Sequence, residues 1–115
     1  TAGNARPANC ARWHRWRRHL KKPTLIDPEV FQRLGQLSRS ERADCMLALH
    51  ELQDGFGQPH LHAGLAIRKL RATTFECRGN LKLRFLFESR PECLYVFALL
   101  SHDEVRRLLR SGRIV

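Results

Sequence analysis

Four side chains have the types and spacing for chemistry on a phosphodiester. Arg84 lies in the middle of an alternating apolar and basic stretch, and arginine offers phosphate a bidentate pair of donors that lysine lacks. Glu76 and Arg78 are two residues apart and share one face of the preceding stretch. A capping box that starts at Ser101 places His102 in the first turn of a helix, where the helix dipole favours neutral imidazole. Metal-independent cleavage of an RNA strand requires a base, an acid and cations that stabilise the pentavalent phosphorane, and these residue types can supply them.

Each of these residues also has a purely structural interpretation. Arg84 could be an exposed strand residue that pairs with Glu76 or Glu88. Glu76 could act as the base, orient an arginine or only neutralise one. The chain has six histidines, so His102 could also stand at this point by chance.

The charge is unevenly distributed along the chain. The formal net charge is +10, with 21 Lys and Arg against 11 Asp and Glu. Residues 1–23 hold seven cations and no carboxylate, and residues 65–90 hold seven cations and two carboxylates. The stretch between them, residues 24–63, holds three cations and six carboxylates. Two basic regions of this kind favour binding to a polyanion, with an affinity that falls steeply with salt; solvated basic faces are the alternative.

Two groups of basic residues are candidates for nucleic-acid contact. One lies in the strand-like part of the chain, where a solvated sheet edge is the alternative. The other accompanies Trp13 and Trp16, which could stack on bases or pack onto the domain and leave the arginines in solvent. The candidates are Arg68, Lys69, Arg71, Lys82, Arg12, Arg15, Arg17 and Arg18.

The length and composition fit one cytoplasmic domain. A chain of 115 residues predicts a basic arm over residues 1–23 and one folded domain over residues 24–115. The four cysteines form no C-x-x-C pair, and His60 and His62 lack a third ligand, so no metal site and no cofactor are expected. Cys45 and Cys77 are expected in the core. No apolar run approaches the length of a membrane span, and no signal-peptide core follows the basic N-terminus.

Capping signals and apolar periodicity predict three helices. The first begins at Asp27 and Pro28, with a stripe of Val30, Phe31, Leu34 and Leu37. The second begins at the Ser38 capping box and ends at Gly55, with Met46, Leu49, Leu52 and Cys45 inward. The third begins at Ser101 and ends at Gly112, with Val105, Leu108 and Leu109 inward.

Between the second and third helices the period changes to two. Strands are expected around residues 65–71, 74–78, 81–88 and 94–100. Leu81, Leu83, Phe85 and Phe87 would face the core, which leaves a cationic outer face. The sequence therefore predicts an α+β domain, in which a helical hairpin and a short C-terminal helix pack on one face of a small antiparallel sheet.

Several short sequence motifs, together with the order in which they occur, resemble the RelE/ParE superfamily of toxins from bacterial toxin–antitoxin pairs. They are Leu52–Gly55 before Pro59, Arg68–Arg71, Phe75–Arg78, Leu83–Phe87 and Leu99–His102, within residues 31–110. The resemblance implies a RelE-like fold, an arginine in the third strand at the position of Arg84, and a His or Lys near His102. Two features depart from the pattern: residues 24–26, between two prolines, make a poor first strand, and the Trp/Arg-rich arm is unusual.

The resemblance leaves three functions open. The leading one is a RelE-like endoribonuclease that cleaves mRNA at the ribosome and is neutralised by an acidic, partly helical antitoxin across the basic sheet. The second is a ParE-like inhibitor of DNA gyrase. The third is a non-catalytic nucleic-acid-binding protein. For a toxin of this kind, contact with DNA would come only through the toxin–antitoxin complex, and no membrane is involved.

Overall fold

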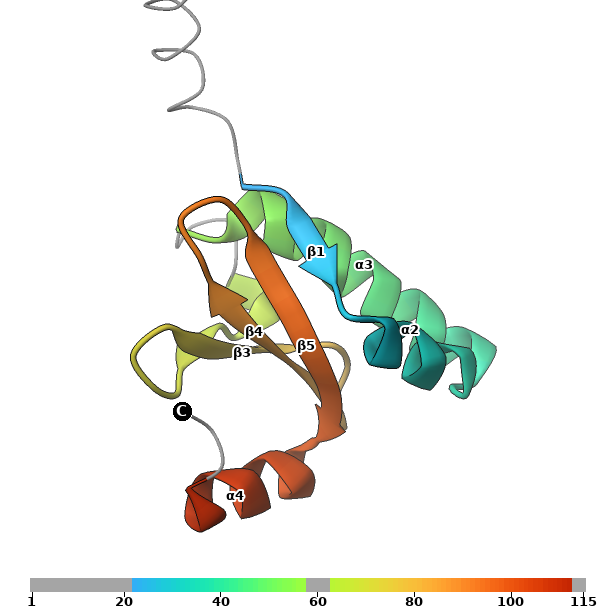
Figure 1. Cartoon of the computed structure of the whole chain (residues 1–115). Coiled ribbons are helices and arrows are strands. Elements are labelled where there is room, and N and C mark those ends of the chain that lie inside the picture. The colour runs from blue at the N-terminus through green and yellow to red at the C-terminus, as the bar shows by residue number, and fades with distance from the viewer. Residues whose placement is uncertain (1–21, 58–62, 113–115) are drawn as a thin grey trace, which may run out of the picture.

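The computed structural model describes residues 22–57 and 63–112. The elements are β1 (Thr24–Ile26), α2 (Pro28–Gly35), α3 (Arg39–Gly55), the 3₁₀ turn η2 (Ala63–Leu65), β2 (Arg68–Lys69), β3 (Thr74–Arg78), β4 (Leu83–Ser89), β5 (Leu94–Ser101) and α4 (His102–Ser111) (Figure 1). The nucleic-acid candidates Arg12, Arg15, Arg17 and Arg18, and the pair His60 and His62, lie outside the described residues.

The five strands form one mostly antiparallel sheet in the order β1-β5-β4-β3-β2. This confirms the α+β class, but residues 24–26 form a true strand, so the expectation of a poor one is wrong. The edge strand β1 pairs in parallel with β5 (Figure 1). Its flanking prolines do not interrupt the ladder, because the Pro23 carbonyl accepts from Leu94 N at 2.9 Å and Asp27 N donates to the Val96 carbonyl at 2.9 Å.

Helices α2 and α3 cover one face of the sheet and enclose the main core. Both start at the predicted caps: Asp27 accepts from the backbone N–H of Glu29, and Ser38 forms its capping box with Glu41. The core joins Val30, Leu34, Cys45, Ala48, Leu49 and Leu52 to Cys77, Leu83, Phe85, Phe87, Leu94, Val96 and Leu99.

Two predicted core residues of these helices point to solvent instead. Phe31 is 53% exposed and Met46 is 46% exposed. Each follows a core position directly, and a step of one residue turns a side chain by about 100° around the helix axis. The core line therefore runs through Val30 and Leu34 in α2, and Ala48 joins it in α3.

Helix α4 packs on the opposite face of the sheet, which corrects the expectation of helices on one face only. A second core joins Leu86 and Val105, with Leu70, Phe97, Ala98, Leu100, Leu108 and Leu109 around them. Leu86 lies on the same face of β4 as Arg84, the face expected to point outward, and is nonetheless fully buried. The cationic outer face is thus confined to the end of the sheet near Lys82 and Arg84.

Two strands are shorter than expected from the sequence. Leu81, predicted in the core, precedes β4 and is 85% exposed, and β2 is shorter than the expected strand at 65–71.

A salt bridge connects helix α2 to helix α4, and it predicts that the stability of the fold depends on pH. Arg33 of α2 donates to Glu104 of α4 at 2.9 Å, and Glu104 also accepts from Ser101 N at 2.8 Å. The Arg33 contact, followed by the Ser101 N–H, lowers the pKa of Glu104 from 4.5 to about 2. Because the folded state holds this carboxylate ionised, its contribution is complete above the unfolded pKa and is lost as the pH falls towards 2.

We therefore expect Glu104→Gln to lower the free energy of unfolding at pH 6 by about 1–2 kcal/mol, a value reduced for the partial exposure of both side chains. The difference should shrink to a small remainder near pH 2, where about half of the wild-type carboxyl is protonated. Glutamine retains the capping geometry, so urea unfolding of both proteins at the two pH values isolates the charge. An equal loss at both pH values would contradict the assignment.

Candidate functional site

Two arginines face each other at the end of the sheet. Arg78 in β3 and Arg84 in β4 are direct partners in the antiparallel register, so their side chains leave the same face. Arg84 Nη1 donates to the carbonyls of Asn80 and Leu83, each at 3.0 Å. Within the described residues neither arginine forms an ion pair with a carboxylate. Like charges directly opposite each other destabilise a strand pair, so this placement is suited to an anion between them.

The turn between β3 and β4 holds this pair in place. Asn80 Oδ1 accepts from the backbone N–H groups of Lys82 and Leu83, both at 2.8 Å. Gly79 lies against the core, and a Cβ at this position would come within 3.0 Å of Cys45 Sγ and 3.2 Å of the Phe85 ring. A larger residue would require Cys45 Sγ and the Phe85 ring to shift by a few tenths of an ångström, so glycine lets the turn lie directly against the buried face. Sequence reasoning missed the role of Asn80 as the hydrogen-bond acceptor of this turn.

His102 lies at the same end of the sheet as the two arginines. Ser101 is the register partner of Leu83, and His102 N donates to the Lys82 carbonyl at 3.2 Å. The predicted capping box is present, and His102 is the first residue of α4. His102 Nδ1 is buried and has no hydrogen-bond partner within the described part of the chain. Any proton exchange with a bound molecule would therefore use Nε2.

Glu76 forms a salt bridge with Arg68 and not with the arginine pair. It is 5% exposed, and its Oε2 lies 3.0 Å from Nη2 of Arg68, its register partner on β2. Glu88 pairs instead with Arg90 at 2.7 Å. Neither carboxylate pairs with Arg84. The geometry of Glu76 favours a role in holding Arg68 over that of an accessible base.

The remaining basic candidates lie in different places. Lys69 is the register partner of Phe75, which packs in the main core, so Lys69 leaves the sheet on the α2–α3 face. Arg71 Nη1 donates to the Leu70 carbonyl at 2.9 Å within its own turn. Lys82 is exposed beside His102. The structure thus brings together Arg78, Lys82, Arg84 and His102, and leaves Arg68, Lys69 and Arg71 at the β2 edge.

The sequence matches no protein-family model and no curated protein. The fold, however, is similar to that of solved structures. A chain of the archaeal RelE–RelB complex from Pyrococcus horikoshii OT3 aligns with a TM-score of 0.59 and 14% identity, over 70% of this chain and 94% of that one. A chain of the RelB–RelE antitoxin–toxin complex from Methanococcus jannaschii aligns with a TM-score of 0.57 and 15% identity, over 72% and 95% respectively. This chain has the RelE fold.

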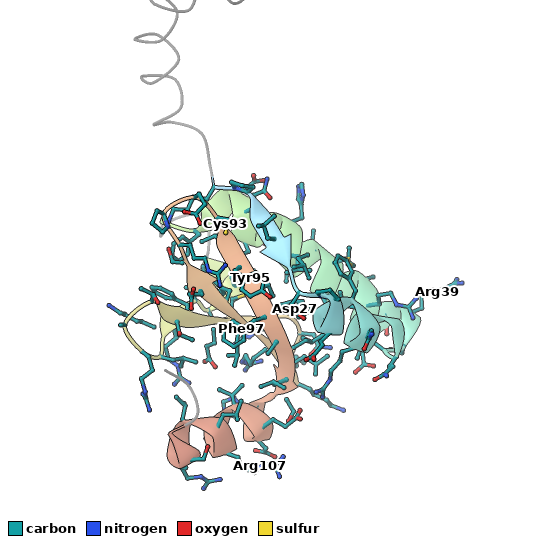
Figure 2. The ribbon with its side chains drawn as sticks, in the orientation of Figure 1. Asp27, Arg39, Cys93, Tyr95, Phe97 and Arg107 are labelled. Carbon is teal, nitrogen blue, oxygen red and sulfur yellow. The ribbon has the colours of Figure 1, made fainter. Side chains whose placement is uncertain are left out.

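In this RelE fold, a separate polar cluster ties β5 to the start of α2. Tyr95 donates its hydroxyl hydrogen to Asp27 (Figure 2). The Arg90 guanidinium lies 4.4 Å from the centre of the Tyr95 ring. The hydrogen bond lowers the pKa of Asp27 and raises that of Tyr95. Asp27 is also the N-cap of α2, so this cluster fixes the helix to the sheet.

The RelE fold also carries exposed apolar residues in a groove that Arg78 of the arginine pair helps to line. An open groove of about 270 Å³ runs between α3 and the β3–β4 turn, and Leu47 and Leu81 on its walls are 57% and 85% exposed.

No group of three His, Cys, Asp or Glu side chains that could hold a metal ion occurs within residues 22–57 and 63–112. Over the same ranges, no helix is both long and apolar enough to cross a membrane.

Proposed function

We propose that this protein is the toxin of a toxin–antitoxin pair and acts as a metal-independent endoribonuclease on mRNA at the ribosome. The observation that carries the proposal is the unpaired face-to-face placement of Arg78 and Arg84, with His102 at the same end of the sheet. The RelE fold supports it, because the similar solved structures are of RelE with RelB.

In the proposed reaction the scissile phosphate lies between the two guanidinium groups. The 2′-oxygen of the RNA attacks phosphorus, the bond from phosphorus to the 5′-oxygen breaks, and a 2′,3′-cyclic phosphate forms. Arg84 and Arg78 stabilise the negative charge that develops on the non-bridging oxygens, which is the term that lowers such barriers most. The 2′-hydroxyl loses a proton and the leaving 5′-oxygen gains one. His102 carries one of these transfers at Nε2, and solvent water carries the other.

The proposed partners are the ribosome and a cognate antitoxin. Lys82 and the arginine pair would contact RNA phosphates, with an affinity that falls with salt. Leu47 and Leu81 would give an antitoxin the apolar contact that the core of a protein interface requires. An acidic antitoxin segment over the arginine pair would neutralise the cations that bind the phosphate.

The decisive experiment induces the full chain without an antitoxin, maps mRNA ends and measures gyrase-dependent supercoiling. We expect new mRNA ends phased with codons and unchanged supercoiling. The same chain with Arg84→Gln, induced to the same level, is the control and should leave mRNA intact. Loss of supercoiling with intact mRNA would instead indicate a gyrase inhibitor, and normal growth would indicate a non-catalytic binding protein.

A further inference from the structure

The outer face of α4 carries three exposed arginines, Arg106, Arg107 and Arg110, which we call the α4 arginines. Figure 2 shows Arg107 on the side of α4 that is turned away from the sheet. Within the described residues none of the three forms an ion pair. Glu104 on the same helix is already bound to Arg33 and to the Ser101 cap. The α4 arginines are therefore available to an external anion.

The position of α4 relative to the candidate site is fixed by several contacts. Its first residue donates to the Lys82 carbonyl, its capping box is closed, and Val105 is 1% exposed in the second core. Arg106 lies about one helical turn beyond His102, and Arg110 lies one turn further. An RNA strand that leaves the arginine pair past His102 would meet these side chains next.

Nucleic acid fits this face better than protein does. The core of a protein interface is apolar. In the described part of the chain the exposed large apolar residues are Leu25, Phe31, Met46, Leu47 and Leu81, and none of them belongs to α4. The apolar side chains of α4, Leu108 and Leu109, pack on the sheet instead. Arginine, in contrast, suits the geometry of phosphate oxygens.

We propose that the α4 arginines bind the backbone phosphates of the RNA strand next to the cleaved bond, as a sequence-independent contact separate from the chemistry. The inference rests on the proposed function for the identity of its ligand. It does not require cleavage, because each phosphate contact contributes through the release of counterions.

The test measures how binding of a fluorescein-labelled single-stranded RNA depends on salt, with every 2′-hydroxyl methylated so that the RNA cannot be cleaved. The full chain with Arg106→Gln, Arg107→Gln and Arg110→Gln together should reduce the slope of log affinity against log salt by about 2, at about 0.7 per phosphate contact. Arg107→Gln alone should reduce it by about 0.7. The matched control is Arg39→Gln, an exposed arginine at the start of α3, away from α4, which should leave the slope unchanged (Figure 2).

Two results would overturn the inference. One is an unchanged slope in the triple variant, and the other is an equal change in the Arg39 and Arg107 variants. If the triple variant with an unchanged slope also loses binding to the antitoxin, the face belongs to a protein interface. Melting temperatures of all variants establish that they are folded. If methylated RNA binds through the α4 arginines but natural RNA is never cut, the proposed function fails and the inference stands.

Discussion

Replacing Arg84 with glutamine is expected to slow RNA cleavage by about 10²–10³-fold, the cost of removing one donor from a site that stabilises transition-state charge. The folded protein should not lose stability. Arg84 stands opposite Arg78 in the β3–β4 ladder, and relief of two facing like charges is worth about 0.2–1 kcal/mol. The Leu83 carbonyl still accepts from Gly79 N at 2.9 Å, and Asn80 lies in the turn, where water can replace the lost donor. Cleavage of a defined RNA and the thermal unfolding of both proteins provide the two measurements.

Two further variants show whether the effect belongs to the arginine pair. Arg78→Gln should also reduce cleavage and preserve stability, because it removes the other half of the pair. Arg84→Lys retains the charge but cannot donate two hydrogen bonds in parallel, so it should restore only part of the rate. Arg39→Gln removes an equal charge at a distance and should have no effect. If Arg84→Gln unfolds the protein in proportion to the activity it loses, Arg84 has a structural role and the assignment fails.

Features set by a few adjacent residues were predictable from the sequence. The caps at Asp27, Ser38 and Ser101 are hydrogen bonds between residues two or three positions apart, and all three are present. The burial of Cys45 and Cys77 is likewise confirmed. The two prolines that flank residues 24–26 argue locally against a strand, whereas β1 forms because it pairs with β5, about 70 residues later in the chain.

The candidate site shows the same division between local and non-local information. Alternation in β4 placed Arg84 on the outward face, and the order of the strands suggested that His102 lies near it. The pairing of Glu76 with Arg68 and of Lys69 with Phe75 depends on the register between β2 and β3, which a slip of one residue would reverse. Burial of Leu86 depends on where α4 crosses the sheet, and no pattern within β4 contains that information.

His102→Ala is expected to reduce cleavage by about 10²–10⁴-fold, the usual contribution of one positioned acid or base. Added imidazole should restore part of the rate by entering the space left by the ring, a rescue that a merely structural histidine would not allow. His50→Ala is the matched control, since His50 is an exposed histidine of α3 whose Nε2 lies 3.9 Å from Asp54 Oδ2. If His102→Ala reduces the rate and added imidazole restores none of it, His102 only supports α4, and the proton must move by way of another group or solvent.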